Sequence, residues 1–311
     1  MRSAFEKLWK ASPALTAAGV LMTAAAVVSL AGMLVDERTI TGAPAWLKPL
    51  KFGVSTAVYS FTLAWIFSWL REWPRVRQVV GWMTAVVFVL EVAIIGVQVW
   101  RGTTSHFNVS TPFNSALFIV MGSAIMIQTA GSIAVAVALW KQKFEDRSMA
   151  WALRFGMTLT IVGALTGPLM TRPTGPQLAG IRAGERPTTI GAHTIGGPDG
   201  GPGVPVTGWS RAHGDLRVPH FVGLHAMQVL PLVAAGLRRR RRPGTDRVRA
   251  MVATAASYGL LFLLLLWEAL RGKSVMVPDA AAVAIWALAT AGAVAWAAFG
   301  QSEVAQKEVT A

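Results

Sequence analysis

The stretch Pro13–Val35, PALTAAGVLMTAAAVVSLAGMLV, contains no charged side chain and decides the class of the fold. A run of about 20 apolar residues can cross the roughly 30 Å hydrocarbon core of a bilayer as a helix. The basic, amphipathic segment MRSAFEKLWK precedes the run, as in a signal peptide. The run is longer than the apolar core of a signal peptide, so we expect a first membrane helix that stays in place.

Seven further apolar runs of similar length follow along the 311 residues. The chain is 53% hydrophobic and 14% charged, with a mean hydropathy of +0.49, far too apolar for a soluble domain of this length. We therefore predict an all-α integral membrane protein, one polytopic domain over residues 1–311. The eight predicted spans are Pro13–Val35, Lys48–Leu70, Gln78–Val99, Phe113–Trp140, Met149–Met170, Pro219–Leu237, Arg249–Leu270 and Ala280–Phe299.

Charge and composition exclude several classes of function. The net charge of +14 comes largely from basic residues in short loops between apolar runs, where they orient helices, so nucleic acid is not an expected partner. The expected partner is the lipid bilayer. The absence of cysteine excludes disulfides, thiolate metal sites and cysteine nucleophiles. Any bound metal must use His, carboxylate or Met ligands.

The distribution of Lys and Arg predicts the orientation of the helices. With eight crossings, the N-terminus, the even-numbered connections and the C-terminal tail hold 17 basic residues, whereas the other four connections hold 11 over a greater length. Basic residues concentrate on the cytoplasmic side, so both termini are expected there. The run Arg238–Arg242 is the strongest anchor. A multi-pass protein of the cell membrane, in a bacterial inner membrane, is the expected location.

The segment from Thr171 to Val218 joins the fifth and sixth predicted spans and faces outward on this topology. It holds eleven glycines and six prolines, a composition that argues against a helix and is typical of a lid or a disordered loop. The part from Arg172 to Thr207 is expected to be mobile. The part from Trp209 to Val218 carries aromatic and charged residues that could dock back onto the helices.

The candidate site begins in the stretch Trp209–Gln228, WSRAHGDLRVPHFVGLHAMQ. Glu91 lies about eight residues before the outer end of the third predicted span, and His225 six residues into the sixth, which places them roughly 12 Å and 9 Å below one surface. We therefore expect Glu91 and His225 to share a cavity, with His220 and at least one of His213, Asp215 and His106 at its mouth. Pro231 predicts a bend near Met227.

The residue types in this set permit several roles. The predicted catalytic residues are Glu91, His225 and Asp215; the predicted metal ligands are His213, His220 and His225; the predicted haem ligands are His106 and His225. The predicted substrate-binding residues are Lys48, Lys51, Arg211, Arg217 and Glu268. The five-residue spacing of His220 and His225 does not suit two ligands on one helix face. His193 lies in the segment expected to be mobile and is not included in the candidate site.

Each assignment has a simpler alternative. Glu91 could be a protonated glutamate bonded to a neighbouring helix, and Lys48 and Lys51 could reach toward lipid headgroups. Asp215 could bind the free amides at the start of the sixth helix instead of orienting a histidine.

The set favours an outward-facing membrane enzyme that uses a divalent metal or haem b, acting on a small molecule or a lipid. The alternative is a proton-coupled transporter of a small anionic or amphipathic solute, in which Glu91 and His225 carry the proton. A scaffold that binds another membrane protein is a third possibility.

Overall fold

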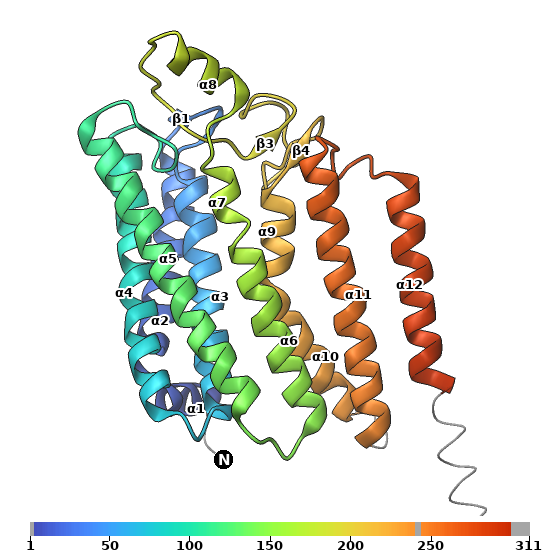
Figure 1. Ribbon diagram of the computed structural model, residues 1–311. Helices are drawn as coiled ribbons and strands as arrows, with labels where there is room; N and C mark the ends of the chain where they lie inside the picture. The colour runs from blue at the N-terminus through green and yellow to red at the C-terminus, as the bar shows by residue number, and fades with distance from the viewer. Residues whose placement is uncertain (1–2, 240–243, 300–311) are drawn as a thin grey trace, which may run out of the picture. The chain divides into compact units, whose positions relative to one another are not determined.

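The computed structural model describes residues 3–239 and 244–299 of the chain. In this part of the chain the secondary structure is almost entirely helical, with short strands in the connections (Figure 1). Seven of the described helices are long and apolar enough to cross a membrane, and a bent pair of shorter helices is an eighth candidate. The prediction of an all-α, multi-pass membrane fold is confirmed at this level, and the side on which the termini lie stays a prediction.

The chain divides into two compact units. Unit 1 comprises Met1–Ala138 and Met170–Ala192, and unit 2 comprises Leu139–Leu169 and His193–Ala311. The elements of unit 1 are α1 (Ala4–Ala11), α2 (Pro13–Val35), β1 (Thr39–Ile40), β2 (Ala43–Pro44), α3 (Leu47–Trp69), α4 (Pro74–Trp100), most of α5 (Pro112–Lys141) and α8 (Gly175–Arg182). Those of unit 2 are α6 (Arg147–Ala164), β3 (Thr194–Ile195), β4 (Gly214–Asp215), α9 (Arg217–Leu224), α10 (Ala226–Arg239), α11 (Gly244–Leu270) and α12 (Ala280–Phe299). The short helix α7 (Gly167–Met170) crosses the boundary.

In unit 1, α1 ends and α2 begins at the same residue. Ser12 has an extended backbone, its N–H donates to the carbonyl of Leu8, and its hydroxyl accepts from the N–H of Leu15. The serine thus satisfies backbone groups that two helix ends leave open. Gly81 of α4 packs on this corner, since a Cβ added there would lie 2.8 Å from the Ser12 hydroxyl. The start of the first span is therefore fixed against α4.

The first two spans of unit 1, α2 and α3, are joined by a tight hairpin and pack closely. Strands β1 and β2 pair antiparallel around Thr41 and Gly42, whose φ angles of 50° and 77° both lie in the left-handed region. Two such residues in succession give the turn that suits a two-residue hairpin. Deeper in the pair, Gly53 of α3 allows close approach to α2, because a Cβ there would lie 3.0 Å from the backbone of Ala26.

In unit 2, α6 and α9 touch through their backbones. A Cβ added to Gly163 would lie 2.6 Å from the Cα of Gly223, and one added to Gly223 would lie 2.5 Å from the Cα of Gly163. Two turns earlier in α6, a Cβ added to Gly156 would lie 3.1 Å from the carbonyl oxygen of Ala226, the first residue of α10. Small residues at such positions let membrane helices approach closely.

The sixth predicted span is bent. Helices α9 and α10 meet at His225 with a 43° change of direction, two residues before the position near Met227 that Pro231 predicts. The N–H of His225 still donates to Phe221 and its carbonyl still accepts from Val229, so the hydrogen-bonded backbone continues through the bend.

One predicted span is interrupted near its end, and one segment predicted to lack helix contains helix and strand. The span expected over Met149–Met170 ends as a regular helix at Ala164, because the Thr166 hydroxyl binds the carbonyl of Gly163 and Pro168 has no N–H to continue the helix. The segment Thr171–Val218, expected to lack helix, contains α8 and the paired strands β3 and β4. Helix α8 starts with a capping box in which Thr174 and Gln177 bond each other's backbone.

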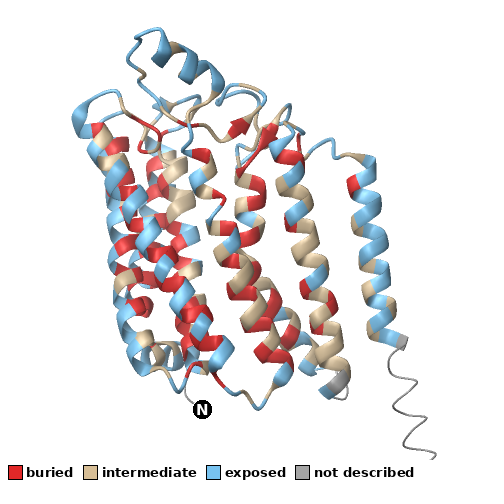
Figure 2. Cartoon of the chain, viewed as in Figure 1, coloured by how far each residue is buried: buried red, intermediate tan, exposed pale blue. Residues whose placement is uncertain are grey.

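The outer faces of the long helices carry large apolar side chains. In α2, Val27 and Leu34 are 62% and 82% exposed, while Met22 and Ala26 of the same helix are buried. Figure 2 shows buried and exposed faces along α3, α4, α5 and α6 as well, whereas α12 is largely exposed. Exposed apolar surface on this scale is expected where lipid covers a helix.

Candidate functional site

Three buried polar residues line one face of α4 in unit 1. Thr84, Glu91 and Gln98 follow one another at seven-residue intervals, and their exposed fractions are 0%, 1% and 0%. Seven residues make almost two helical turns, so the side chains lie in one row with about 10 Å between neighbours. We call this row the polar stripe of α4.

The Thr84 end of the stripe is a hydrogen-bonded cluster shared by three helices. The Thr84 hydroxyl donates to Oε1 of Gln128 on α5 at 2.7 Å. The amide nitrogen of Gln128 donates to the hydroxyls of Tyr59 on α3 and Ser132 on α5 at 3.4 and 3.5 Å. These two hydroxyls lie 3.1 Å apart. Every member of this cluster has a partner, as buried polar groups require.

The Gln98 end is also satisfied. The side-chain nitrogen of Gln98 donates to Asn114 Oδ1 and to the carbonyl of Thr104, both at 3.1 Å. Arg101 donates to the side-chain oxygens of Gln98 and Asn114 at 2.6 and 2.7 Å. These contacts tie the end of α4 to the start of α5.

Glu91, in the middle of the stripe, differs from both ends. Neither of its carboxyl oxygens has a hydrogen-bond partner. Along α4, Phe88 packs with Ala124 on one side of it and Ile95 with Met121 on the other. Glu91 is 1% exposed, so its side chain faces the protein interior and not lipid.

An ionised carboxylate in such surroundings is costly unless it is paired or binds a proton. Lys48, partly buried in the first turn of α3, attracts the Glu91 carboxylate electrostatically. Lys51 lies one turn further along α3 and is also partly buried. The two lysines predicted to bind substrate therefore lie in the first turns of the helix that packs beside α4.

His106, predicted as a haem ligand, lies in the connection between α4 and α5. Its Nδ1 is 3.1 Å from the hydroxyl of Ser105, and its ring centroid is 5.4 Å from that of Phe52 on α3. It belongs to unit 1 with Glu91, whereas His225 belongs to unit 2. The shared cavity of Glu91 and His225 and the ligand pair His106 and His225 stay predictions.

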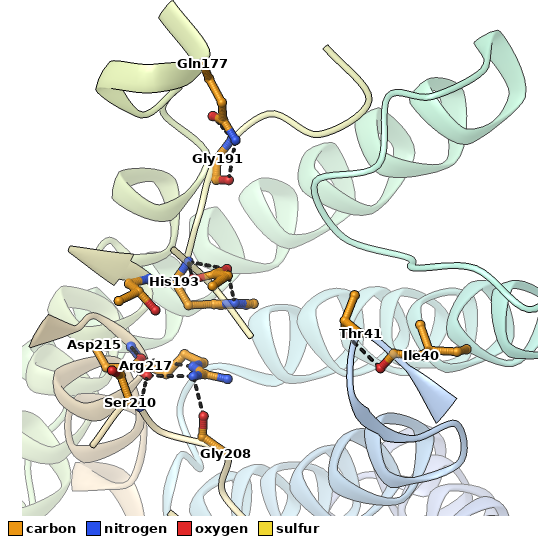
Figure 3. A network of polar contacts seen from close by, with 11 residues as sticks. Ile40, Thr41, Gln177, Gly191, His193, Gly208, Ser210, Asp215 and Arg217 are labelled. Carbon is orange, nitrogen blue, oxygen red and sulfur yellow. Dashed lines mark hydrogen bonds and ion pairs between the residues drawn. The ribbon is translucent and has the colours of Figure 1, made fainter. Parts of the chain in front are cut away.

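Asp215 of unit 2 binds the start of α9 and the loop before it (Figure 3). Its Oδ1 accepts from the backbone N–H and Nε of Arg217 at 3.0 and 2.9 Å, and its Oδ2 accepts from the Arg217 guanidinium at 2.6 Å and from the N–H of Ser210 at 2.8 Å. The same guanidinium donates to the carbonyl of Gly208 at 2.7 Å. Asp215 thus binds a helix-entrance amide, the simpler alternative, and its hydrogen bonds go to Arg217 and Ser210 instead of a histidine. Arg217, predicted to bind substrate, is held by Asp215.

The three histidines predicted as metal ligands each have separate surroundings in unit 2. Nδ1 of His220 donates to the carbonyl of Gly163 at 2.9 Å and lies 3.1 Å from the Thr166 hydroxyl. The ring of His225 lies 4.1 Å from that of Phe221. The ring of His213 lies over Gly197, where a Cβ would come within 2.4 Å of it.

No metal-ligand group forms around these histidines. Within residues 3–239 and 244–299, no three His, Asp or Glu side chains are grouped so that they could hold a metal ion. The predicted metal site at His213, His220 and His225 is therefore not supported, nor is the haem site.

Glu268 of α11 caps the start of the next helix. It is 4% exposed, and its Oε1 accepts from the N–H of Asp279, just before α12. Together with Asp215 and Lys273 it borders a cavity of about 10 Å³, which has room for about one water molecule. This cavity is too small for the substrate expected at Glu268. Arg211 is exposed, and its backbone N–H donates to the carbonyl of Pro202.

The loop after Thr207 docks onto α9, as its aromatic and charged residues predict. The ring of Trp209 lies 5.5 Å from that of Phe221, edge to face. The hydroxyl of Ser274, beyond α11, donates to the carbonyl of Ser210 at 3.2 Å.

His193, left out by the sequence reasoning, is a well-bonded residue of unit 2. Asp199 accepts from its backbone N–H at 2.9 Å, from its Nδ1 at 2.9 Å and from the N–H of Thr194 at 2.8 Å (Figure 3). Partial burial raises the pKa of Asp199, but the hydrogen bonds and positive charge of His193 outweigh it and hold that pKa well below its usual range. The carbonyl of His193 accepts from the N–H of Leu216 at 3.0 Å, which ties this bonded pair to the start of α9.

Protein-family models, curated proteins and solved structures give no match to this chain. The functional inference therefore starts from the residues of the chain itself.

Proposed function

We propose that the protein is a proton-coupled membrane transporter in which Glu91 binds and releases the proton. The observation that carries this proposal is the position of Glu91: 1% exposed, on a membrane-spanning helix, with neither carboxyl oxygen hydrogen-bonded. Ionisable groups inside membrane spans are expensive and mark proton relays and ion pathways. A buried carboxyl whose only purpose is structural has a hydrogen-bond partner as a rule.

The polar stripe gives Glu91 neighbours in both directions along α4. The hydroxyls of Thr84, Tyr59 and Ser132 form one end, and the Gln98 cluster forms the other. Each end is about 10 Å from Glu91, a distance that water molecules entering during transport have to bridge. In this proposal the proton rests on Glu91 and leaves when water reaches it from either end.

Lys48 supplies the opposite charge that the ionised state needs. When Glu91 releases its proton, the ammonium group of Lys48 lowers the cost of the carboxylate through their attraction. When Glu91 is protonated, Lys48 and Lys51 can attract an anion instead. Alternation between these two states couples one proton to a small anionic or amphipathic solute.

The metal-dependent or haem-dependent enzyme has less support. Its three proposed ligands in unit 2 have separate surroundings, and the cavity beside Asp215 and Glu268 has room for about one water molecule. Glu91, by contrast, is a buried ionisable group without a hydrogen bond.

Proton flux in vesicles tests the proposal. The purified chain is reconstituted with a trapped pH-sensitive dye, a potassium diffusion potential is imposed, and a panel of small carboxylate and phosphate anions is added in turn. We expect at least one anion to change the internal pH, and Glu91→Gln to reduce this anion-dependent rate by tenfold or more. Glu185→Gln makes the same chemical change at an exposed position and should leave the rate unchanged.

Infrared spectroscopy gives a second readout that needs no solute. The carbonyl stretch of a protonated, weakly hydrogen-bonded carboxylic acid should be present in the wild type and absent in Glu91→Gln. The proposal would be contradicted if no anion changed the internal pH of wild-type vesicles faster than that of protein-free vesicles. It would also be contradicted if Glu91→Gln and the wild type showed the same anion-dependent rate.

A further inference from the structure

We infer that α1 and the connection between α3 and α4 form a binding surface for anionic phospholipid headgroups. The inference concerns unit 1 alone and is independent of the transport proposal. It combines the exposed aromatic face of α1, the place where α1 joins the first span, and the surplus of basic groups at that end of the unit.

Helix α1 is amphipathic, and none of its residues is buried in the protein. Phe5 and Trp9 lie four residues apart on one face, are 50% and 46% exposed, and have ring centroids 6.2 Å apart. Glu6 and Lys10 border a shallow hollow together with these two rings. Lys7 lies about half a turn away from both rings. A helix with aromatic rings on one face and Lys on the other is typical of a segment that lies in a bilayer surface.

The position of α1 places it at the surface of the membrane. Ser12 alone separates it from α2, the first membrane span, and Gly81 of α4 packs against this corner. Helix α1 packs against α2 and α3, and Figure 1 shows it lying across the end of unit 1 where α2 begins. Phe5 and Trp9 are therefore held at the level where a bilayer changes from acyl chains to headgroups.

Basic groups outnumber acidic ones at this end of unit 1. Helix α3 ends and α4 begins there, so the connection between them lies at the same end as α1. The basic residues are Lys7, Lys10, Arg71, Arg75 and Arg77, against Glu6 and Glu72. A juxtamembrane cluster of this kind attracts anionic lipids, and each basic group strengthens the attraction about fivefold.

Arg77 and the tryptophans near it fix the connection to the ends of α3 and α4. One of its amino groups donates to the carbonyl of Phe67 at 3.3 Å, while its Nε is buried without an acceptor. Nε1 of Trp73 nearby in the sequence also lacks an acceptor. Trp65 and Trp69 pair at the end of α3, 6.0 Å apart, and Trp82 of α4 is 61% exposed. Tryptophan is enriched at this depth of the bilayer.

The absence of cysteine allows a local test of depth. A nitroxide is attached at Phe5→Cys or at the exposed position Lys7→Cys in the full chain, in vesicles of phosphatidylcholine and phosphatidylglycerol. We expect the label at position 5 to be more accessible to oxygen than to a water-soluble nickel complex, and the label at position 7 to show the reverse. Equal access of the nickel complex to both positions would overturn the inference, because α1 would then lie in water.

The lipid preference is measured at the same place. A fluorescent donor at Phe5→Cys reports energy transfer to acceptor-labelled phosphatidylglycerol or phosphatidylcholine in nanodiscs. We expect phosphatidylglycerol to be enriched around position 5 several-fold, and Lys7→Gln with Lys10→Gln to bring this enrichment close to one. Arg182→Gln with Arg186→Gln removes the same charge from exposed positions of another segment and should leave it unchanged. Equal enrichment of the two lipids around the wild-type chain would refute the headgroup preference.

Discussion

The carboxylate of Asp199 accepts hydrogen bonds from both the backbone N–H and the ring Nδ1 of His193, six residues earlier in the chain. The turn Gly196–Asp199, GGPD, brings the two residues together within a segment whose composition suggests mobility. Because Leu216 binds the carbonyl of His193, this contact helps to position the entrance of α9.

The first prediction is that this contact weakens in acid. The pKa of Asp199 is depressed in the folded chain, so its contribution to stability is present above the unfolded value of about 3.8 and is lost as the pH falls further, through the folded value. A spin label at the exposed position Ala212→Cys should stay immobile from pH 7 to about pH 4 and gain mobility below that. Asp199→Asn should be mobile at pH 7 already. A label equally immobile in Asp199→Asn would show that the contact does not hold the loop.

The second prediction concerns the stability cost of Glu91. A buried polar group without a partner costs about 1–3 kcal/mol. Glu91→Leu should therefore raise the free energy of unfolding by about that amount, measured by thermal denaturation in detergent, while it abolishes proton coupling. A stabilised but inactive variant would separate the two roles. A large loss of stability would instead mean that Glu91 has a structural partner.

The third prediction concerns the backbone contact between α6 and α9. Gly223→Ala places a methyl group 2.5 Å from the Cα of Gly163, so the helices must move apart, at a cost of about 1–3 kcal/mol. Gly236→Ala is the matched control, because α10 has nothing within 4 Å of a Cβ at that position. The control should be neutral or stabilising by up to about 1 kcal/mol, since Ala favours the helix over Gly. Similar effects of the two substitutions would contradict the close contact.

The fourth prediction concerns Asp215. Asp215→Asn removes the charge from the acceptor of the hydrogen bonds to Arg217 and Ser210. A hydrogen bond to a charged group contributes about 1.5–3 kcal/mol to the stability of the folded state. The amides of Ser210 and Arg217 should exchange with deuterium at least tenfold faster than in the wild type. Arg211→Gln changes an exposed charge in the same segment and should leave the exchange unchanged.

The membrane helices could be predicted because hydrophobicity over about 20 residues is a local property. The run Pro13–Val35 is a helix with the predicted bounds, and the bend of the sixth span was visible in Pro231. Helix α8 was missed because the high Gly and Pro content outweighed the Thr174-x-x-Gln177 capping pattern. That capping pattern is also local, so the start of α8 could have been predicted from the sequence.

The candidate site was predicted only in part, because a site depends on which faces meet. Burial of Glu91 followed from the cost of a charge in lipid, but its lack of a hydrogen bond depends on residues of α3 and α5 that no local pattern identifies. The polar stripe itself could have been found from the seven-residue spacing of Thr84, Glu91 and Gln98. His193 could not be ranked from composition, since its importance comes from the turn that returns Asp199 to it.

The hydrogen bond from Thr84 to Gln128 has a consequence for how the chain is made. Helix α4 leaves the ribosome before α5, so Thr84 and Glu91 enter the bilayer before their neighbours on α5 exist. The insertion machinery accepts such a segment because its other residues are strongly apolar, and a neutral, protonated Glu91 makes the transfer easier still. Gln128 then enters the bilayer with α5, where Thr84 of α4 is already present to donate its hydrogen bond. The order of synthesis thus makes the pairing of these two segments an early step in the biogenesis of the protein.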